Sequence, residues 1–162
     1  MINRTLLSLL ALGTLLITAC DNRRVFEDNK PITNSTWKQN HPVVFKVAIT
    51  DTITPYNLYV NIRNSGNYQY SNLFLFVKMY FPNGQRTRDT VECTLAEPGG
   101  KWLGDGLGDI YDNQKLFKES IRFPRTGTYT FEVEQAMRID PLQGITDIGM
   151  RVERASGAVV KK

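Results

Sequence analysis

The sequence is poor in the residues that most often carry out chemistry, with two cysteines and one histidine among 162 residues. The histidine, His41, follows a polar stretch and precedes Pro42, so neither a Ser–His–Asp set nor a Cys–His pair has a convincing general base. No run of basic residues is present, which argues against nucleic-acid binding despite a formal charge of +4. We therefore expect a protein that is not an enzyme and that uses no cofactor.

Long apolar runs are also absent, except over residues 6–17, which are almost all aliphatic. This run fits the ~7–15-residue apolar core of an export signal and falls short of the about 20 residues that a spanning helix needs. It follows Arg4 and ends in an aliphatic residue and two small residues before Cys20. The sequence predicts a lipoprotein signal peptide over residues 1–19, with Cys20 lipidated as the first residue of the mature chain.

Acyl chains on Cys20 would attach the mature chain to a membrane by its N-terminus. Two or three chains give a stable anchor, whereas a single chain binds reversibly. Residues 20–40 are polar and rich in turn formers, apart from Val25, Phe26 and Trp37. We predict a lipidated N-terminus and tether over this segment.

From Pro42 onward, apolar residues recur at every second position, which is the period of a β-strand. About seven such segments, separated by turn sequences and without a convincing amphipathic helix, predict an antiparallel β-sandwich over residues 41–154. Its topology is immunoglobulin-like or jelly-roll, and residues 155–162 form a flexible tail. Cys93 alternates with apolar neighbours and should face the core. The clearest strands are expected at 43–49, 56–62, 73–81, 86–95, 129–133 and 145–153.

Glycines cluster in the second half of the chain, and residues 97–118 show little alternation. We predict a long loop there, and loops of this length within a compact domain are often functional. Asp105, Asp109 and Asp112 offer oxygen ligands for Ca²⁺, but their spacing is not that of the common Ca²⁺ loop. We interpret the aspartates as turn residues and predict no metal site.

Two blocks of sequence are especially distinctive, Gly100-Lys101-Trp102-Leu103-Gly104 and Gln135-Ala136-Met137-Arg138. Together with the lipoprotein signal, they resemble the GldH family of gliding-motility lipoproteins over nearly the whole mature chain. The resemblance implies a lipoprotein required for gliding and associated with the type IX secretion machinery. It also implies protein partners in that machinery and anchoring in the outer membrane, facing the periplasm. It brings no catalytic residues.

Two functional hypotheses remain open. In the first, a non-enzymatic assembly lipoprotein, the lipid concentrates the sandwich near other membrane components. The segment 99–111 then acts as a recognition surface, with Trp102 as a rigid anchor. In the second, a carbohydrate-binding surface lipoprotein, exposed aromatic rings stack on sugars. The candidate interaction residues are Lys101, Trp102, Leu103, Asp105 and Asp109, and the candidate sugar-binding rings are Tyr68, Tyr70, Trp102 and Tyr111.

Overall fold

The computed structural model describes residues 21–156. The predicted signal peptide over residues 1–19, the predicted lipidation site Cys20 and residues 157–162 lie outside this part. Within it, no helix has the length and apolar character needed to cross a bilayer. The strands are β1 (Arg24–Pro31), β2 (Thr36–Trp37), β3 (Val43–Ile49), β4 (Tyr56–Ser65), β5 (Asn72–Tyr80), β6 (Arg86–Thr94), β7 (Asp105–Leu107), β8 (Ile110–Ile121), β9 (Gly127–Gln135), β10 (Leu142–Gln143) and β11 (Ile145–Arg154).

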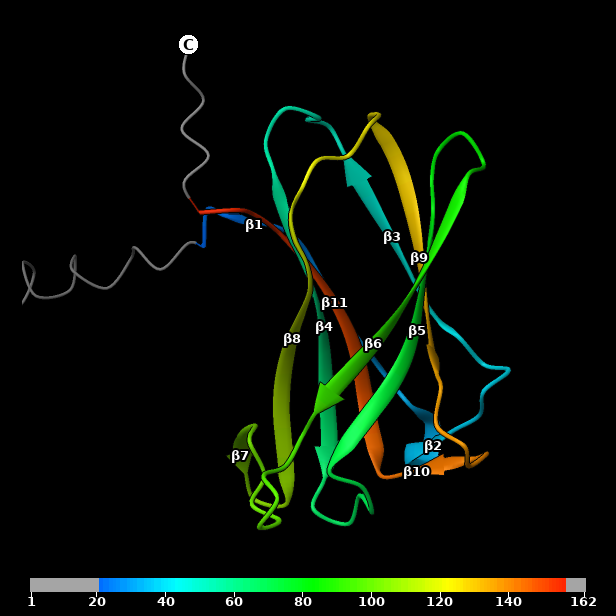
Figure 1. The fold of residues 1–162 in the computed structure, drawn as a ribbon, viewed down its shortest axis with the longest axis vertical. Helices are drawn as coiled ribbons and strands as arrows, with labels where there is room; N and C mark the ends of the chain where they lie inside the picture. Colours follow the sequence, from blue (N-terminus) through cyan, green and yellow to red (C-terminus); the bar gives the residue numbers. More distant parts are fainter. Residues whose placement is uncertain (1–20, 157–162) are drawn as a thin grey trace, which may run out of the picture.

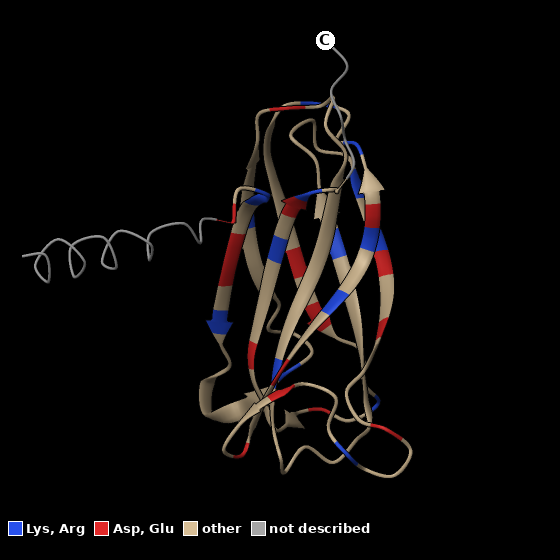
Figure 2. Ribbon diagram, turned by 90° about the vertical axis from the view of Figure 1, so that its left-hand side faces the viewer, with Lys and Arg blue, Asp and Glu red and all other residues tan. Residues whose placement is uncertain are grey.

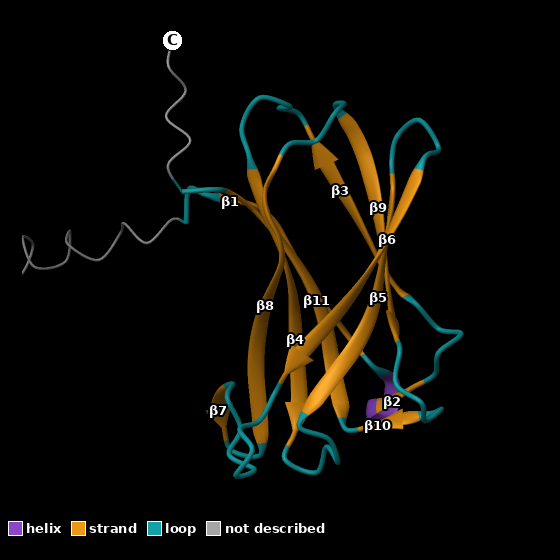
Figure 3. Cartoon of the chain, in the orientation of Figure 1, coloured by secondary structure: helices purple, strands orange, loops and turns teal. Residues whose placement is uncertain are grey.

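Two antiparallel sheets pack face to face, which confirms the predicted all-β sandwich (Figure 1). The larger sheet has the strand order β1-β11-β4-β8-β7 and the smaller has β3-β9-β5-β6, while β2 and β10 form a separate ladder. The one helical turn among the described residues, η2 (Thr33–Ser35), lies next to β2 (Figure 3). Charged residues of both signs are interspersed along the strands (Figure 2).

The pairing of the long strands is nested. β1 pairs with β11, β3 with β9, β4 with β8, and β5 with β6, as when one long antiparallel hairpin is rolled up. Eight strands in two sheets with this order form a jelly roll, which decides between the two predicted topologies. Three of these four pairs join residues that are far apart in the chain, and only β5 and β6 form a local hairpin.

Alternate residues of both sheets fill one continuous core. Val60 and Ile62 of β4 and Leu75 and Val77 of β5 all belong to this core, and all four are at most 1% exposed. The period of two therefore identified the inward positions correctly. Cys93 is 1% exposed, so its predicted place in the core is also confirmed.

The N-terminal segment differs from the predicted tether, because residues 24–37 belong to the domain. β1 forms the edge of the larger sheet along β11, and Phe26 packs edge-on against Phe45 with ring centroids 6.4 Å apart. Trp37 is 1% exposed, and its indole Nε1 donates a hydrogen bond to the His41 carbonyl at 3.0 Å. An edge strand buries few of its own side chains, so β1 lacks the alternation that marks a strand in the sequence.

The predicted loop over residues 97–118 is also wrong, because this segment contains β7 and most of β8. Glycines permit the close packing of this hairpin: a Cβ on Gly104 would lie 2.6 Å from the Asp112 carbonyl oxygen. β7 pairs with only the first three residues of β8, so the rest of β8 is the edge of the sheet. This part of β8 exposes polar side chains, and the alternation of apolar residues that marks a strand is therefore missing from its sequence. At the other boundary, Ala155 is 8% exposed and donates its N–H to the Pro55 carbonyl, so the domain continues past residue 154.

The sandwich has two ends, which we call basal and distal. The basal end comprises residues 21–24, 49–56, 80–86, 121–127 and 154–156, and therefore includes the first described residues. The distal end comprises residues 31–43, 65–72, 94–110 and 135–145 (Figure 1). β8 connects the two ends with 12 residues, which at about 3.3 Å per residue separates them by roughly 40 Å.

Candidate interaction surface

The distal segment that the sequence singled out is built as two small hairpins. In the first, Ala96 pairs with Trp102, the Glu97 N–H donates to the Lys101 carbonyl at 2.8 Å, and the turn uses Gly100 at a φ of +84°. The Leu103 N–H then donates to the Leu95 carbonyl at 2.9 Å, which ties the segment to the end of β6. The second hairpin is β7 with the start of β8. The segment is therefore held in a defined conformation by backbone hydrogen bonds.

Trp102 lies inside an aromatic cluster and does not project from the surface. Its ring centroid is 5.5 Å from that of Tyr111 and 6.4 Å from that of Tyr68, which in turn lies 5.6 Å from Tyr70. Tyr68 is 4% exposed and Trp102 is half-buried against the core. The four rings proposed for sugar stacking thus pack largely on one another. Trp102 therefore braces the hairpins, and its neighbours Leu103 and Leu107 expose more of their surface to a partner.

The two leucines of this segment are the side chains that project. Leu103 is 51% exposed and Leu107, at the tip of the second hairpin, is 87% exposed. Lys101 is exposed at the first hairpin beside them. A single exposed leucine needs no explanation, but two on adjacent rigid hairpins, with a lysine beside them, form a surface that can take an apolar contact.

The aspartates of the segment have structural partners. The Asp109 carbonyl accepts the Gly66 N–H at 2.8 Å, and its carboxylate occupies the place that a Cβ on Gly66 would need, so it fixes the hairpin tip to the β4–β5 turn. The backbone of Asp105 pairs with that of Asp112 across the β7–β8 ladder, and the Asp112 carboxylate is bound by Arg63 Nε at 2.6 Å. Within residues 21–156, no group of three or more His, Cys, Asp or Glu side chains is arranged to hold a metal ion.

A shallow pocket of about 280 Å³ lies behind Leu103, between the end of β6 and the start of β8. Cys93 and Asn113 contribute to its lining, together with Lys115. Burial raises the pKa of the Cys93 thiol to about 12, so the group stays protonated and is a poor nucleophile. The Asn113 amide donates to the Asn64 side chain at 3.0 Å, so its polar atoms are engaged in holding β8 on β4.

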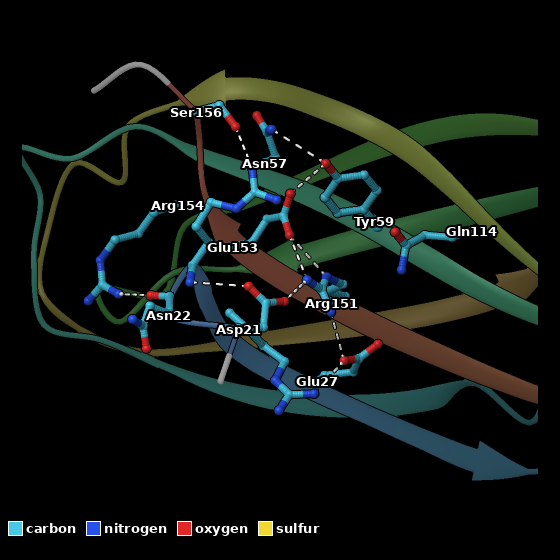
Figure 4. Close-up of polar contacts among 12 residues, drawn as sticks. Asp21, Asn22, Glu27, Asn57, Tyr59, Gln114, Arg151, Glu153, Arg154 and Ser156 are labelled. Carbon is cyan, nitrogen blue, oxygen red and sulfur yellow. Dashed lines mark hydrogen bonds and ion pairs between the residues drawn. The ribbon is translucent and has the colours of Figure 1, made fainter. Parts of the chain in front are cut away.

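A cluster of charged and polar side chains, which the sequence did not indicate, lies on the outer face of the larger sheet near the basal end (Figure 4). The Arg151 guanidinium binds Glu27 at 2.9 Å, Glu153 at 2.7 Å and the carboxylate of Asp21. Tyr59 donates its hydroxyl to the other Glu153 oxygen at 2.8 Å. The cluster joins β1, β4 and β11 and fastens the first described residue to the sheet.

These contacts shift the carboxyl groups toward their charged forms. The hydrogen bond from Arg151 lowers the pKa of Asp21. Burial raises the pKa of Glu153, but the hydrogen bonds from Arg151 and Tyr59 outweigh it, and the net pKa lies below the ordinary value. The pKa of Glu27 is lowered in the same way, against its burial. No periodicity or spacing in the sequence could have identified this cluster, because its members come together only when the first and last strands pair.

The sequence also identifies the protein family to which this fold and these surfaces belong. The sequence profile of the GldH lipoprotein family matches residues 24–152, which span both sheets and the distal hairpins. The chain belongs to this family. The resemblance predicted from the two distinctive blocks is therefore confirmed. The profile match begins at the first residue of β1, in agreement with the N-terminal boundary of the folded domain.

Two relatives from the GldH family align along most of their length. The chain is 37% identical over 148 residues to a gliding motility lipoprotein GldH homolog of Christiangramia forsetii, covering 87% of this chain and 90% of the relative. It is 36% identical over 153 residues to the gliding motility lipoprotein GldH of Flavobacterium johnsoniae, with 90% and 94% covered. Among solved structures, a chain of infectious bursal disease virus Gx strain superposes with a TM-score of 0.39 at 15% identity, covering 86% of this chain and 34% of the viral chain.

Proposed function

We propose that this chain is an exported lipoprotein that serves gliding motility as a non-enzymatic binding component. Lipid on Cys20 anchors it to the outer membrane, on the periplasmic face, in association with the type IX secretion machinery. Membership of the GldH lipoprotein family and the names of both relatives support a role in gliding. The apolar run before Cys20 supports export and lipidation.

The observation that carries the binding role is the placement of Leu103 and Leu107. They are 51% and 87% exposed, on hairpins that backbone hydrogen bonds and Trp102 hold in place. These hairpins lie at the distal end, whereas the chain enters the sandwich at the basal end (Figure 1). An anchor at one end leaves the leucines free to meet a protein partner about 40 Å away along β8.

The test is a paired substitution, Leu103→Ser with Leu107→Ser, in cells that carry no other copy of the gene. We expect colony spreading to be lost or strongly reduced, and cross-linked partners to be recovered from native membranes at a fraction of the normal yield. Because both side chains project into solvent, the thermal midpoint should change by only a few degrees. Gliding and partner recovery at normal levels would refute the assignment of this surface.

Ile139→Ser is the matched control. Ile139 is 44% exposed and belongs to the β9–β10 connection. This connection lies at the same end of the sandwich, beside β2 and β10 (Figure 1). Its substitution removes a comparable apolar side chain and should leave spreading and partner recovery intact. Equal losses in both variants would mean that the effect comes from general surface change.

The anchor and the absence of sugar binding are tested separately. Mass spectrometry of the purified mature N-terminus should find acyl groups on Cys20, and Cys20→Ala should release the protein from membranes. Titration with cell-wall and polymer sugars should leave tryptophan fluorescence unchanged, since Trp102 packs against Tyr68 and Tyr111. A saturable fluorescence change with one sugar would favour the carbohydrate-binding alternative instead.

A further inference from the structure

The two ends of the sandwich carry different charge. Within the segments that define the basal end there are two aspartates and six arginines, and every one of these arginines is exposed. The segments of the distal end hold three basic and four acidic residues. The arginines come from four separate stretches of sequence, so the fold brings together residues that are dispersed along the chain. They are Arg23, Arg24, Arg86, Arg122, Arg125 and Arg154.

The carboxylates of the two basal aspartates do not neutralise the positive charge on the outer surface of this end. Asp21 is held sideways by Arg151 on the outer face of the larger sheet. Asp51 is turned into its own loop, where one carboxylate oxygen accepts the Ile53 N–H at 2.7 Å and the Thr54 N–H at 3.2 Å. Arg24 is paired with Glu27 at 3.1 Å, but the other five basal arginines have no carboxylate partner among the described residues, so the charge that this end presents is mainly positive.

The same loop displays an apolar side chain. Ile53 is 72% exposed, although the loop around it is well ordered by contacts. Arg122 donates from Nε to the Ile53 carbonyl at 2.9 Å, and the buried Tyr56 donates its hydroxyl to the Asp51 carbonyl at 3.0 Å. Asp51 caps the turn from the other side. Ile53 thus stands outward on a fixed turn next to an arginine, which is the combination found where a surface meets lipid headgroups.

The route of the chain limits how far this end can stand from a membrane. Asp21 is one peptide bond, with a Cα–Cα distance of about 3.8 Å, from the residue that carries the proposed lipid. Asp21 is bound to Arg151, and the Arg154 N–H donates to the Arg23 carbonyl at 2.8 Å. No slack segment intervenes before β1 begins at Arg24. A lipid at position 20 brings the basal end to the bilayer surface.

We infer that the basal end is a membrane-contacting surface for anionic lipid, with Ile53 entering the headgroup region and the arginines facing lipid phosphates. The sandwich then stands upright and points its distal end away from the bilayer. This inference rests on the proposed lipidation of Cys20. Basic residues close to an anionic surface each add attraction that falls off within a Debye length, so orientation should depend on lipid charge and on salt.

The test reconstitutes the lipidated protein into phosphatidylglycerol-containing vesicles that carry a lipid-bound fluorescence quencher. A fluorophore is attached in turn at Ile53→Cys and Leu107→Cys, while Cys93 remains unlabelled because it is 1% exposed. We expect quenching at position 53 to exceed that at position 107 by about threefold or more, since the ends lie roughly 40 Å apart. Equal quenching would overturn the proposal, because the sandwich would then lie flat or tumble.

Charge reversal supplies the second arm. Arg86→Glu with Arg125→Glu, which leaves the Arg122 contact with the Ile53 loop intact, should bring the quenching ratio close to one, whereas Lys38→Glu with Arg138→Glu, the same change in charge at the distal end, should preserve it. A ratio unaffected by the basal substitutions would refute a role for the arginines. Photocrosslinking from position 53 to protein rather than lipid in native membranes would also overturn the assignment. Mass spectrometry of the N-terminus is read first, so that a missing lipid, which would defeat the proposed function, is not mistaken for a failure of orientation.

Discussion

The substitution Trp37→Ala tests whether the N-terminal segment is part of the folded domain or a flexible tether. Trp37 is 1% exposed, and burial of a tryptophan removes about 150–250 Å² from water, which at about 25 cal/mol/Å² is worth roughly 4–6 kcal/mol. Measured losses for such truncations are about 3–5 kcal/mol. The lost hydrogen bond to the exposed His41 adds little, because water can replace it. We expect a loss of about 4 kcal/mol of unfolding free energy.

The assay is thermal unfolding of the purified protein, followed by far-ultraviolet circular dichroism. At about 3–4 °C per kcal/mol for a domain of this size, the midpoint should fall by roughly 12–16 °C. Trp102→Ala is the matched control, because Trp102 is only half-buried and should cost about half as much. A midpoint lowered by less than about 4 °C in Trp37→Ala would contradict the packing of this segment and restore the tether.

Three further outcomes follow from local contacts. Arg151→Met should cost about 2 kcal/mol at pH 7 in denaturant titrations, and this cost should shrink as the pH falls below the ordinary carboxyl range, because the pKa values of its carboxylate partners are lowered in the folded protein and the stabilisation is lost only as the pH passes through them; a loss independent of pH would refute this. Gly149→Ala places a Cβ 1.8 Å from Asn29 Oδ1 and should cost about 2 kcal/mol or more, whereas Gly99→Ala meets nothing within 4 Å and should be near neutral in the same titrations. Cys93 should react with DTNB at least about a hundredfold faster in denaturant than in native protein, and rapid native reaction would show that the core opens there.

Strands could be predicted from the sequence where buried apolar residues recur at every second position. The alternation in β3, β4, β5, β9 and β11 predicted strands within a few residues of those observed. It failed for β1, β7 and β8, which lie at the edges of the larger sheet or form an edge for most of their length. An edge strand that is partly exposed on both faces has polar side chains on each of them. Its sequence therefore lacks the alternation of apolar and polar residues that marks a strand.

For the candidate interaction segment, the sequence could indicate its position but not the directions of its side chains. The sequence placed the interaction segment at residues 99–111, and the structure gathers this segment at one end of the sandwich. It could not show that Trp102 turns inward onto Tyr68 and Tyr111 while Leu107 turns outward. A large aromatic residue among glycines is equally consistent with a brace and with a contact, and only the neighbours decide.

By itself the sequence determined what is local: an apolar run ending at Cys20, a period of two along most strands, and the blocks that mark the family. Only the tertiary structure showed which strands pair. The backbone N–H and C=O groups that join β1 to β11 are the same in nearly every residue, so the sequence does not specify their partners. That pairing brings Asp21 to Arg151 and places the first described residues at the opposite end of the sandwich from the hairpins of the interaction segment. The arginines of the basal end become a surface for the same reason, since residues that are distant in the chain are neighbours only after the jelly roll has closed.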